Sequence, residues 1–224
     1  MYRRYTEMKV LIFDTETTGL PKYRDIPVKQ MPRNWPHIVS ISWIVLEDNV
    51  EVSRKSYIIK PRGWEVPVES TKIHGISNEK AVSEGHDLEE VINEFIFERY
   101  DLLVAHNLEF DDNVLVNAIY WDLGRKNFRA FPDPKKCSMK LGTDICKIPS
   151  RYGKGYKPPK LSEFYNYVFK RPPIMANLHS SLYDVEVLVD IIQGCRPLQE
   201  KLGLVNPSII NSNDHQKISR ILSL

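Results

Sequence analysis

The chain has 224 residues, of which 42% are hydrophobic and 27% charged, an ordinary composition for one globular domain. The longest early apolar run, residues 10–13, is too short for a signal peptide or a membrane span, so we expect a soluble, intracellular protein with no membrane partner. The three cysteines, Cys137, Cys146 and Cys195, form neither a CxxC pair nor an even disulfide framework, and we expect free thiols.

The net charge of +2 is distributed unevenly along the chain. Residues 125–171 contain thirteen Lys and Arg and three acids, a local net charge of +10, so the rest of the chain is acidic. A basic segment beside acidic clusters is typical of a protein that binds phosphates in one place and metal ions in another. A solvated lysine-rich loop would give the same counts, and the charge alone does not separate the two interpretations.

The first part of the chain predicts three strands. Residues 8–16 have a continuous apolar centre that ends in acids, which indicates a buried strand with its polar groups at the carboxyl end. A connection with four prolines, residues 21–36, follows it. Residues 38–46 and 50–60 alternate between apolar and polar, and the acidic residues 47–49 between them predict a hairpin turn.

Helices and short strands alternate in the middle of the chain. Asp87 predicts a helix N-cap, because Glu90 and a series of apolar residues at helical spacing follow it. Residues 102–105 predict a strand and residues 110–121 a second helix. We expect an edge strand at residues 136–141.

The last part of the chain predicts a loop, two helices and a tail. Residues 146–160 are rich in Gly, Pro, Lys and Tyr and predict the loop, whereas residues 161–169 and 180–192 have apolar residues at helical spacing. Residues 195–224 look weakly structured. Three strands followed by alternating helices and strands predict an α/β domain with a mixed sheet.

Asp14 and Glu16 lie two residues apart at the end of the first predicted strand, so both side chains point to the same face. Carboxylates held together repel each other unless a hard cation such as Mg²⁺ or Mn²⁺ lies between them. The spacing alone is common by chance in a chain with 29 acids. The apolar strand before the pair and the Thr-Thr-Gly turn after it favour a metal site.

Three further residues could complete such a site. Asp111 begins a helix directly after a strand, at the edge of a sheet where ligands gather, although an acid is also favoured there electrostatically and Asp112 is a rival. His179 precedes the last helix, and Asp184 lies about one and a half turns inside it, so both could approach one centre. Each pattern is weak alone, and a histidine before a helix is more often a surface or capping residue.

Five segments occur in the order FDTETTGL at 13–20, KIHGIS at 72–77, HNLEFD at 106–111, PPKLSEFY at 158–165 and HSSLYD at 179–184. The first, third and last resemble the three exonuclease motifs of the DnaQ-like DEDDh family, which includes polymerase proofreading subunits, TREX-type nucleases and ribonuclease T. The second is similar to a family segment near the terminal nucleotide, and the fourth to the segment that leads into the third motif. Matching segments in one order are far more specific than any one of them.

The resemblance covers about residues 8–193. It implies an RNase H-like α/β fold, with a five-stranded mixed sheet flanked by helices. We therefore expect an exonuclease domain at residues 1–193 and a C-terminal tail of unknown role at residues 194–224.

The resemblance also implies an activity, the hydrolysis of nucleic acid from the 3′ end to 5′-mononucleotides with two divalent cations, Mg²⁺ or Mn²⁺. Asp14, Glu16, Asp111 and Asp184 would hold the metals, Glu16 would also take part in catalysis, and His179 would be the general base. The related DEDDy branch has a tyrosine four residues before the last acid, where this chain has Ser180, so the histidine branch is favoured.

Six residues would surround the terminal nucleotide by the same resemblance, namely Thr17, Thr18, Leu20, His74, Asn107 and Phe110. Leu20 could equally be a core residue, and Phe110 a residue of the helix face. Two departures from the family stand out. Ser181 occupies the place of a usual alanine, and the long connection at residues 21–36 could alter which substrate fits.

Three lysines of the basic segment, Lys154, Lys157 and Lys160, are candidates for binding the nucleic-acid backbone. Gly153 and Gly155 around Lys154 do not make a phosphate loop, because the GK[ST] ending is missing. We expect single-stranded nucleic acid or 3′ ends as the substrate, DNA in preference to RNA. An exoribonuclease of the same fold and a non-catalytic binding module are the alternatives, and any polymerase or replication partner would be a separate chain.

Overall fold

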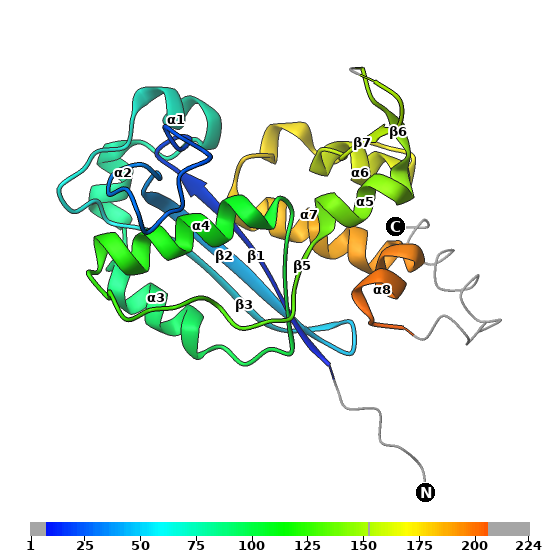
Figure 1. The fold of residues 1–224 in the computed structure, drawn as a ribbon, viewed down its shortest axis with the longest axis horizontal. Coiled ribbons are helices and arrows are strands. Elements are labelled where there is room, and N and C mark those ends of the chain that lie inside the picture. The colour runs from blue at the N-terminus through cyan, green and yellow to red at the C-terminus, as the bar shows by residue number, and fades with distance from the viewer. Residues whose placement is uncertain (1–7, 152, 206–224) are drawn as a thin grey trace, which may run out of the picture.

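The computed structural model describes residues 8–151 and 153–205. A five-stranded mixed sheet forms the centre, with the strand order β3-β2-β1-β4-β5 (Figure 1). Its strands are β1 (Lys9–Thr17), β2 (Ile38–Glu47), β3 (Val50–Ile58), β4 (Leu102–Ala105) and β5 (Lys135–Cys137). The neighbours β1, β2 and β3 are antiparallel, whereas β4 is parallel to β1 and β5 is parallel to β4. The predicted fold class is confirmed.

Helices lie on both faces of this sheet (Figure 1). They are α1 (Val68–His74), α2 (Asn78–Glu84), α3 (Leu88–Phe97), α4 (Leu108–Asn117), α5 (Ser138–Cys146), α6 (Leu161–Phe169), α7 (Ser181–Gly194) and α8 (Arg196–Leu202). Two short elements accompany them, the π-helix η1 (Ala118–Asp122) directly after α4 and the 3-10 helix η2 (Met175–Asn177) before α7.

The central strand β1 contributes to two separate cores because its side chains alternate between the two faces of the sheet. Leu11 and Phe13 pack in one core with apolar residues of α3 and α4. Val10 and Ile12 pack in the other with apolar residues of α6, α7 and α8. The carboxyl end of β1, where its acids lie, is therefore held from both sides.

The predicted edge strand at residues 136–141 is wrong for residues 138–141. The strand β5 ends at Cys137, and α5 begins at Ser138. The buried residues of α5 include Ser138 and Gly142, which carry no hydrophobic signal although they follow helical spacing. Gly142 is required by close packing, since an added Cβ would lie 2.8 Å from side-chain atoms of Phe164 and Pro159.

Three other segments also differ from the sequence prediction. The expected loop at residues 146–160 contains a small antiparallel pair, β6 (Ile148–Pro149) and β7 (Tyr156–Lys157). The weakly structured tail is wrong for residues 196–202, which form α8 and bury Leu198 and Leu202; residues 206–224 lie outside the described part. The helices α1 and α2 were not predicted, because α1 buries only Ser70 and His74 and exposes its apolar residues.

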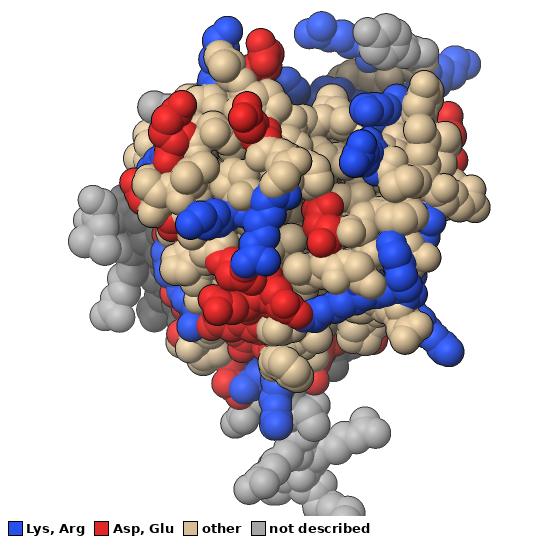
Figure 2. All heavy atoms as spheres, turned by 90° about the vertical axis from the view of Figure 1, so that its left-hand side faces the viewer, with Lys and Arg blue, Asp and Glu red and all other residues tan. Residues whose placement is uncertain are grey.

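Cys137, Cys146 and Cys195 are free thiols, as predicted. None of the helices in the described part of the chain is long and apolar enough to cross a membrane. On the face that Figure 2 shows, acidic side chains gather near the centre and Lys and Arg side chains lie around them. That face therefore carries both charges.

Candidate active site

The end of β1 brings Asp14 and Glu16 to one side of the sheet, where they meet two carboxylates from distant segments. Burial raises the pKa of Asp14 well above its usual value, and the neighbouring charges of Asp111, Glu16 and Asp184 raise it further. Burial likewise raises the pKa of Glu16 to about 8, with Asp184 and Asp111 adding to the effect. Four carboxylates therefore repel one another across a shared, largely dehydrated centre.

Asp111 reaches this centre from the first turn of α4 and is buried. Its Oδ1 accepts hydrogen bonds from the Thr15 backbone N–H, at 3.2 Å, and from the Thr15 hydroxyl, at 2.7 Å. Burial raises the pKa of Asp111 to about 7 although these bonds act in the opposite direction. The rival acid Asp112 forms an ion pair with Lys135 at 2.7 Å, so it is already neutralised.

Asp184 comes from the first turn of α7. Its Oδ2 accepts a hydrogen bond from the His179 backbone N–H at 3.3 Å, and its buried Oδ1 has no hydrogen-bond partner among the described residues. Burial raises the pKa of Asp184 to about 6, against the opposing effect of His179. One ligand atom from each of Glu16, His179 and Asp184 lies within 4.8 Å of the others.

The four acids have the ligand chemistry that a divalent cation needs. Buried carboxylates that repel one another need a positive charge, and hard carboxylate oxygens are the ligands that Mg²⁺ and Mn²⁺ prefer. The buried Oδ1 of Asp184, which has no hydrogen-bond partner among the described residues, is available as a ligand atom. The donor set therefore fits a divalent metal site.

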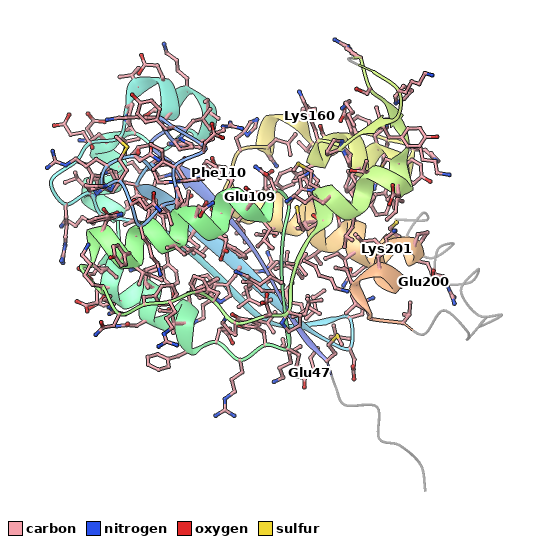
Figure 3. The ribbon with its side chains drawn as sticks, in the orientation of Figure 1. Glu47, Glu109, Phe110, Lys160, Glu200 and Lys201 are labelled. Carbon is pink, nitrogen blue, oxygen red and sulfur yellow. The ribbon has the colours of Figure 1, made fainter. Side chains whose placement is uncertain are left out.

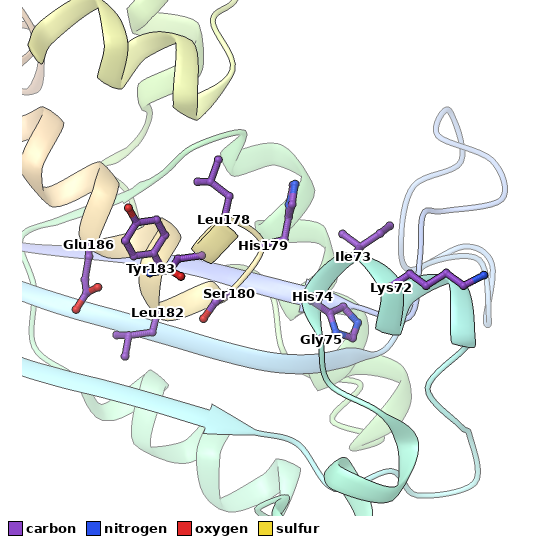
Figure 4. A pocket seen from close by; sticks show the side chains of 11 residues that line it. Lys72, Ile73, His74, Gly75, Leu178, His179, Ser180, Leu182, Tyr183 and Glu186 are labelled. Atoms are coloured by element: carbon purple, nitrogen blue, oxygen red, sulfur yellow. The ribbon is translucent and has the colours of Figure 1, made fainter. Parts of the chain in front are cut away.

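His179 is exposed and adopts a left-handed backbone conformation, with φ of 68°, which is uncommon outside glycine. It borders two cavities. One, of about 550 Å³, contains the four carboxylates. The other, of about 510 Å³, lies between α1 and the start of α7, with His179 and Ser180 on one side and Lys72, Ile73 and His74 on the other (Figure 4). The imidazole is therefore open to solvent beside the carboxylates.

Ser181 connects the start of α7 to the sheet. Its buried hydroxyl lies 3.0 Å from the Ser40 hydroxyl and 2.8 Å from the Ser42 hydroxyl, and Ser42 donates to Ser56 at 2.9 Å. The β1–β2 register places Ser40 opposite Glu16 and Ser42 opposite Asp14. The serine at the usual alanine position thus makes hydrogen bonds to the strand beside the two acids.

The residues expected around the terminal nucleotide occupy different places. Leu20, Asn107 and Phe110 line the carboxylate cavity, and Leu20 is 67% exposed, so it is not a core residue. The Thr17 hydroxyl donates a hydrogen bond to the Gly19 carbonyl within the turn. The Thr18 hydroxyl accepts one from the His37 N–H, directly before β2. His74 is buried and lines the second cavity.

The three candidate lysines lie outside both cavities. Lys154 is exposed between β6 and β7, and Lys157 forms an ion pair with Glu163 at 2.5 Å. Lys160 precedes α6 and lies above Glu109 and Phe110 in the view of Figure 3.

Six residues that line the carboxylate cavity were not assigned from the sequence: Thr15, Pro21, Arg24, Trp35, His106 and Glu109. His106 is the first residue of the HNLEFD segment at 106–111. Its Nε2 lies 3.1 Å from the Pro159 carbonyl and its Nδ1 lies 3.0 Å from the Ser138 hydroxyl, and burial lowers its pKa to about 4. His106 is therefore a neutral connection between β4, α5 and the segment before α6. Arg24 and Trp35 come from the proline-rich connection, which no motif covers.

Solved structures share this fold. Exonuclease X in complex with 5′ overhanging duplex DNA has a TM-score of 0.56 and 21% identity, over 87% of this chain and 93% of that one. E. coli Exonuclease I in complex with a dA16 oligonucleotide has a TM-score of 0.64 and 13% identity over 88% of this chain. Exonuclease I from Methylocaldum szegediense has a TM-score of 0.62 and 18% identity over 87%. This chain spans only 42% of either Exonuclease I, and identities this low show the fold alone.

The fold and its buried carboxylates define a nuclease of the RNase H-like type. The model of the Exonuclease family matches residues 11–192, and the chain belongs to this family. The predicted resemblance to DnaQ-like exonucleases and the prediction of a hydrolytic nuclease are confirmed. Among curated proteins, no sequence matches this chain.

Proposed function

We propose that the protein is a 3′→5′ exonuclease that hydrolyses nucleic acid, DNA in preference to RNA, to 5′-mononucleotides by two-metal-ion catalysis. The observation that carries the proposal is the convergence of four carboxylates from β1, α4 and α7 on one centre, where burial raises their pKa values and no Lys or Arg in the described part of the chain forms an ion pair with them. Such a centre costs stability unless cations bind there, so its presence is best explained by phosphoryl chemistry.

Asp14, Glu16 and Asp184 would hold one divalent cation, Mg²⁺ or Mn²⁺. Asp14 would also contact a second, which Asp111 would support through water. Bound cations would activate a water for attack and stabilise the charge on the departing 3′ oxygen. Because the centre is largely dehydrated, a scissile phosphate bound to these cations would be kept away from bulk water.

His179 would accept the proton of the attacking water. The water oxygen bonds to phosphorus, the bond between phosphorus and the 3′ oxygen breaks, and a 5′-mononucleotide leaves. The closeness of the imidazole to Glu16 and Asp184 supports this role. Its exposure lets the proton pass on to solvent, as a general base requires before the next turnover.

The preference for DNA rests on the DNA bound in solved structures of similar fold. Exonuclease X was solved with 5′ overhanging duplex DNA and E. coli Exonuclease I with dA16 and dT13 oligonucleotides. Single-stranded 3′ ends are therefore the proposed substrate. An exoribonuclease is the second candidate, and a non-catalytic binding module is less well supported because all five catalytic positions are filled. A polymerase partner on a separate chain remains a proposal.

Around the terminal nucleotide we place Leu20, Asn107 and Phe110 in the carboxylate cavity, with Thr17, Thr18 and His74 beside it. Lys154, Lys157 and Lys160 would contact the backbone of the strand further from the cut. Lys160 is the best placed, because the adjoining Pro159 carbonyl contacts His106 of the cavity wall. The exonuclease domain is proposed at residues 1–193, followed by a C-terminal segment at 194–224 whose helix α8 packs on the core of the domain.

The direction of attack and the need for metal can be tested together. Labelled DNA and RNA oligonucleotides of one sequence, each with a free or phosphorylated 3′ end, are digested with Mg²⁺, with Mn²⁺ and with excess chelator. We expect mononucleotides from free 3′ ends only, faster from DNA, and no digestion in chelator. Digestion in chelator would contradict the metal mechanism, and efficient cutting of a closed circular strand would show an endonuclease.

A further inference from the structure

The proline-rich connection between β1 and β2, residues 21–36, is folded on itself by one buried amide. The Asn34 side chain accepts a hydrogen bond from the Tyr23 N–H at 2.9 Å and donates one to the Tyr23 carbonyl at 2.8 Å. The Asn34 carbonyl also accepts from the Lys22 N–H at 3.0 Å. Asn34 is only 2% exposed, so these three bonds are protected from water.

The same connection is attached to the turn that carries the first motif. The Thr18 N–H donates to the His37 carbonyl at 3.0 Å, and the His37 N–H donates to the Thr18 hydroxyl at 3.0 Å. At its middle, the Trp121 indole donates to the Val28 carbonyl at 2.8 Å. The connection is therefore an ordered element fixed at several points.

Arg24 directly follows Tyr23, and Trp35 directly follows Asn34. Both residues line the carboxylate cavity. Trp35 is buried and packs against Phe110, with ring centroids 5.9 Å apart. Arg24 is exposed, and within residues 8–151 and 153–205 no acid forms an ion pair with it. The guanidinium donors are thus free while the backbone that carries them is fixed.

The cavity has two chemically different ends. Asp14, Glu16 and Asp184 form the end that would bind metal and, through the metal, phosphate. Leu20, Pro21, Trp35 and Phe110 supply apolar surface, and Arg24 supplies a guanidinium to the lining of the cavity. A nucleotide whose phosphate lies at the carboxylate end would direct its base towards these apolar residues, because flat apolar side chains pack against base faces.

We propose that Arg24 recognises the base of the 3′-terminal nucleotide and makes the enzyme prefer guanine at that position; this proposal rests on the exonuclease function proposed above. Guanine presents two acceptors, O6 and N7, which match the paired donors of a guanidinium, whereas adenine presents a donor in place of O6. Arg24 thereby acts as a specificity-determining residue, and Asn34 as its positioning residue.

The test compares oligonucleotides that differ only in their 3′-terminal base. Because Arg24 is exposed, we expect the low end of the effect of a bidentate contact, about a fivefold higher kcat/KM for terminal guanine than for adenine in the parent protein. Arg24→Ala should reduce this ratio to about one, and Asn34→Ala should reduce it in part. Lys22→Ala is the matched control, since Lys22 is an exposed cation of the same connection outside the cavity, and it should retain the parental ratio.

Binding of dGMP and dAMP by calorimetry in Mg²⁺ gives a second measurement that does not depend on turnover. The parent should bind dGMP more tightly than dAMP, and Arg24→Ala should bind both equally. Equal preference for the two bases in the parent would overturn the proposal, as would an equal loss for all bases in Arg24→Ala with a flatter salt dependence, which would assign Arg24 to a phosphate. A dGMP preference without any digestion would instead overturn the exonuclease function and leave base recognition standing.

Discussion

The carboxylates and the histidine of the candidate site are held in contrasting ways. Asp14, Asp111 and Asp184 come from the end of a central strand and the first turns of two helices. His179 lies before α7 with a left-handed backbone, and its side chain is exposed. Burial disfavours the charged form of these acids and raises their pKa values. The histidine side chain is instead exposed, where water easily solvates a change of charge.

This difference indicates how the two groups would act. Regular elements keep the acids at fixed separations although they repel one another, so the protein stores a charge arrangement that cations can neutralise. An exposed imidazole can exchange its proton with water at each turnover. Removing an acid should therefore change metal binding and stability together, whereas removing the histidine should change turnover alone.

The largest effect is expected for Asp14→Asn. The charges of Asp111, Glu16 and Asp184 all raise the pKa of Asp14 in addition to burial, and Asp14 would contact both cations. We expect turnover to fall by at least about a hundredfold, because a missing ligand displaces the metals and the reacting water. Steady-state digestion over a range of Mg²⁺ concentrations measures this loss. A variant that matches the parent at saturating Mg²⁺ would remove Asp14 from the metal site.

The same variant should behave in the opposite way when metal is removed. Acids with raised pKa values in the folded state bind more protons folded than unfolded, so stability falls as pH rises between the two pKa values. For Glu16 this window runs from its ordinary pKa of 4.5 to about 8, because burial raises the pKa in the folded state. In chelator, the parental melting temperature should fall from pH 5 to pH 8, and that of Asp14→Asn should fall less. Parallel curves would contradict the repulsion between these acids.

His179→Ala should lower turnover by about a hundredfold or more while substrate binding changes little, since a general base acts in the transition state. Single-turnover digestion and equilibrium binding of a 3′-phosphorylated oligonucleotide separate the two quantities. Melting curves in chelator should match those of the parent, because the side chain is exposed. Parental turnover in this variant would make His179 a residue of the helix start and not the base.

A smaller effect is expected where the two regions join. Ser181→Ala removes two buried hydroxyl contacts between the start of α7 and β2, so Asp184 should be held less accurately. We expect the Mg²⁺ concentration for half-maximal activity to rise by about fivefold, which corresponds to the loss of one typical hydrogen bond. Ser56→Ala is the matched control, since it removes an exposed hydroxyl at the far end of the same group. Equal midpoints for both variants would make Ser181 a packing residue only.

The sequence pattern predicts the parts of the molecule in which side-chain periodicity is strong. The strands β1, β2, β3 and β4 and the helices α3, α6 and α7 lie where alternation or helical spacing placed them. The convergence of the four acids required the motif order as well, because spacing gives no distance between segments. Their mutual effects on pKa agree with that expectation.

The remaining features depend on information that periodicity does not contain. The helix α5 buries Ser138 and Gly142, small residues that fit because α6 approaches closely. The contact of Ser181 with Ser40 and Ser42 depends on strand register and on the packing of α7 against β2. Arg24 and Trp35 reach the cavity only because Asn34 folds a long connection, a hydrogen-bonding arrangement with no sequence period.

The helix α8 has a practical consequence for where the chain can be cut. It lies beyond residue 192, where the family match ends, yet Leu198 and Leu202 are buried in the same core as Val10 and Ile12 of the strand that carries the acids. A chain shortened at residue 193 would expose the apolar surface that these leucines cover, and exposed surface of this kind promotes aggregation. Truncations and fusions should therefore keep the chain through Leu202, because the foldable unit is longer than its family signature.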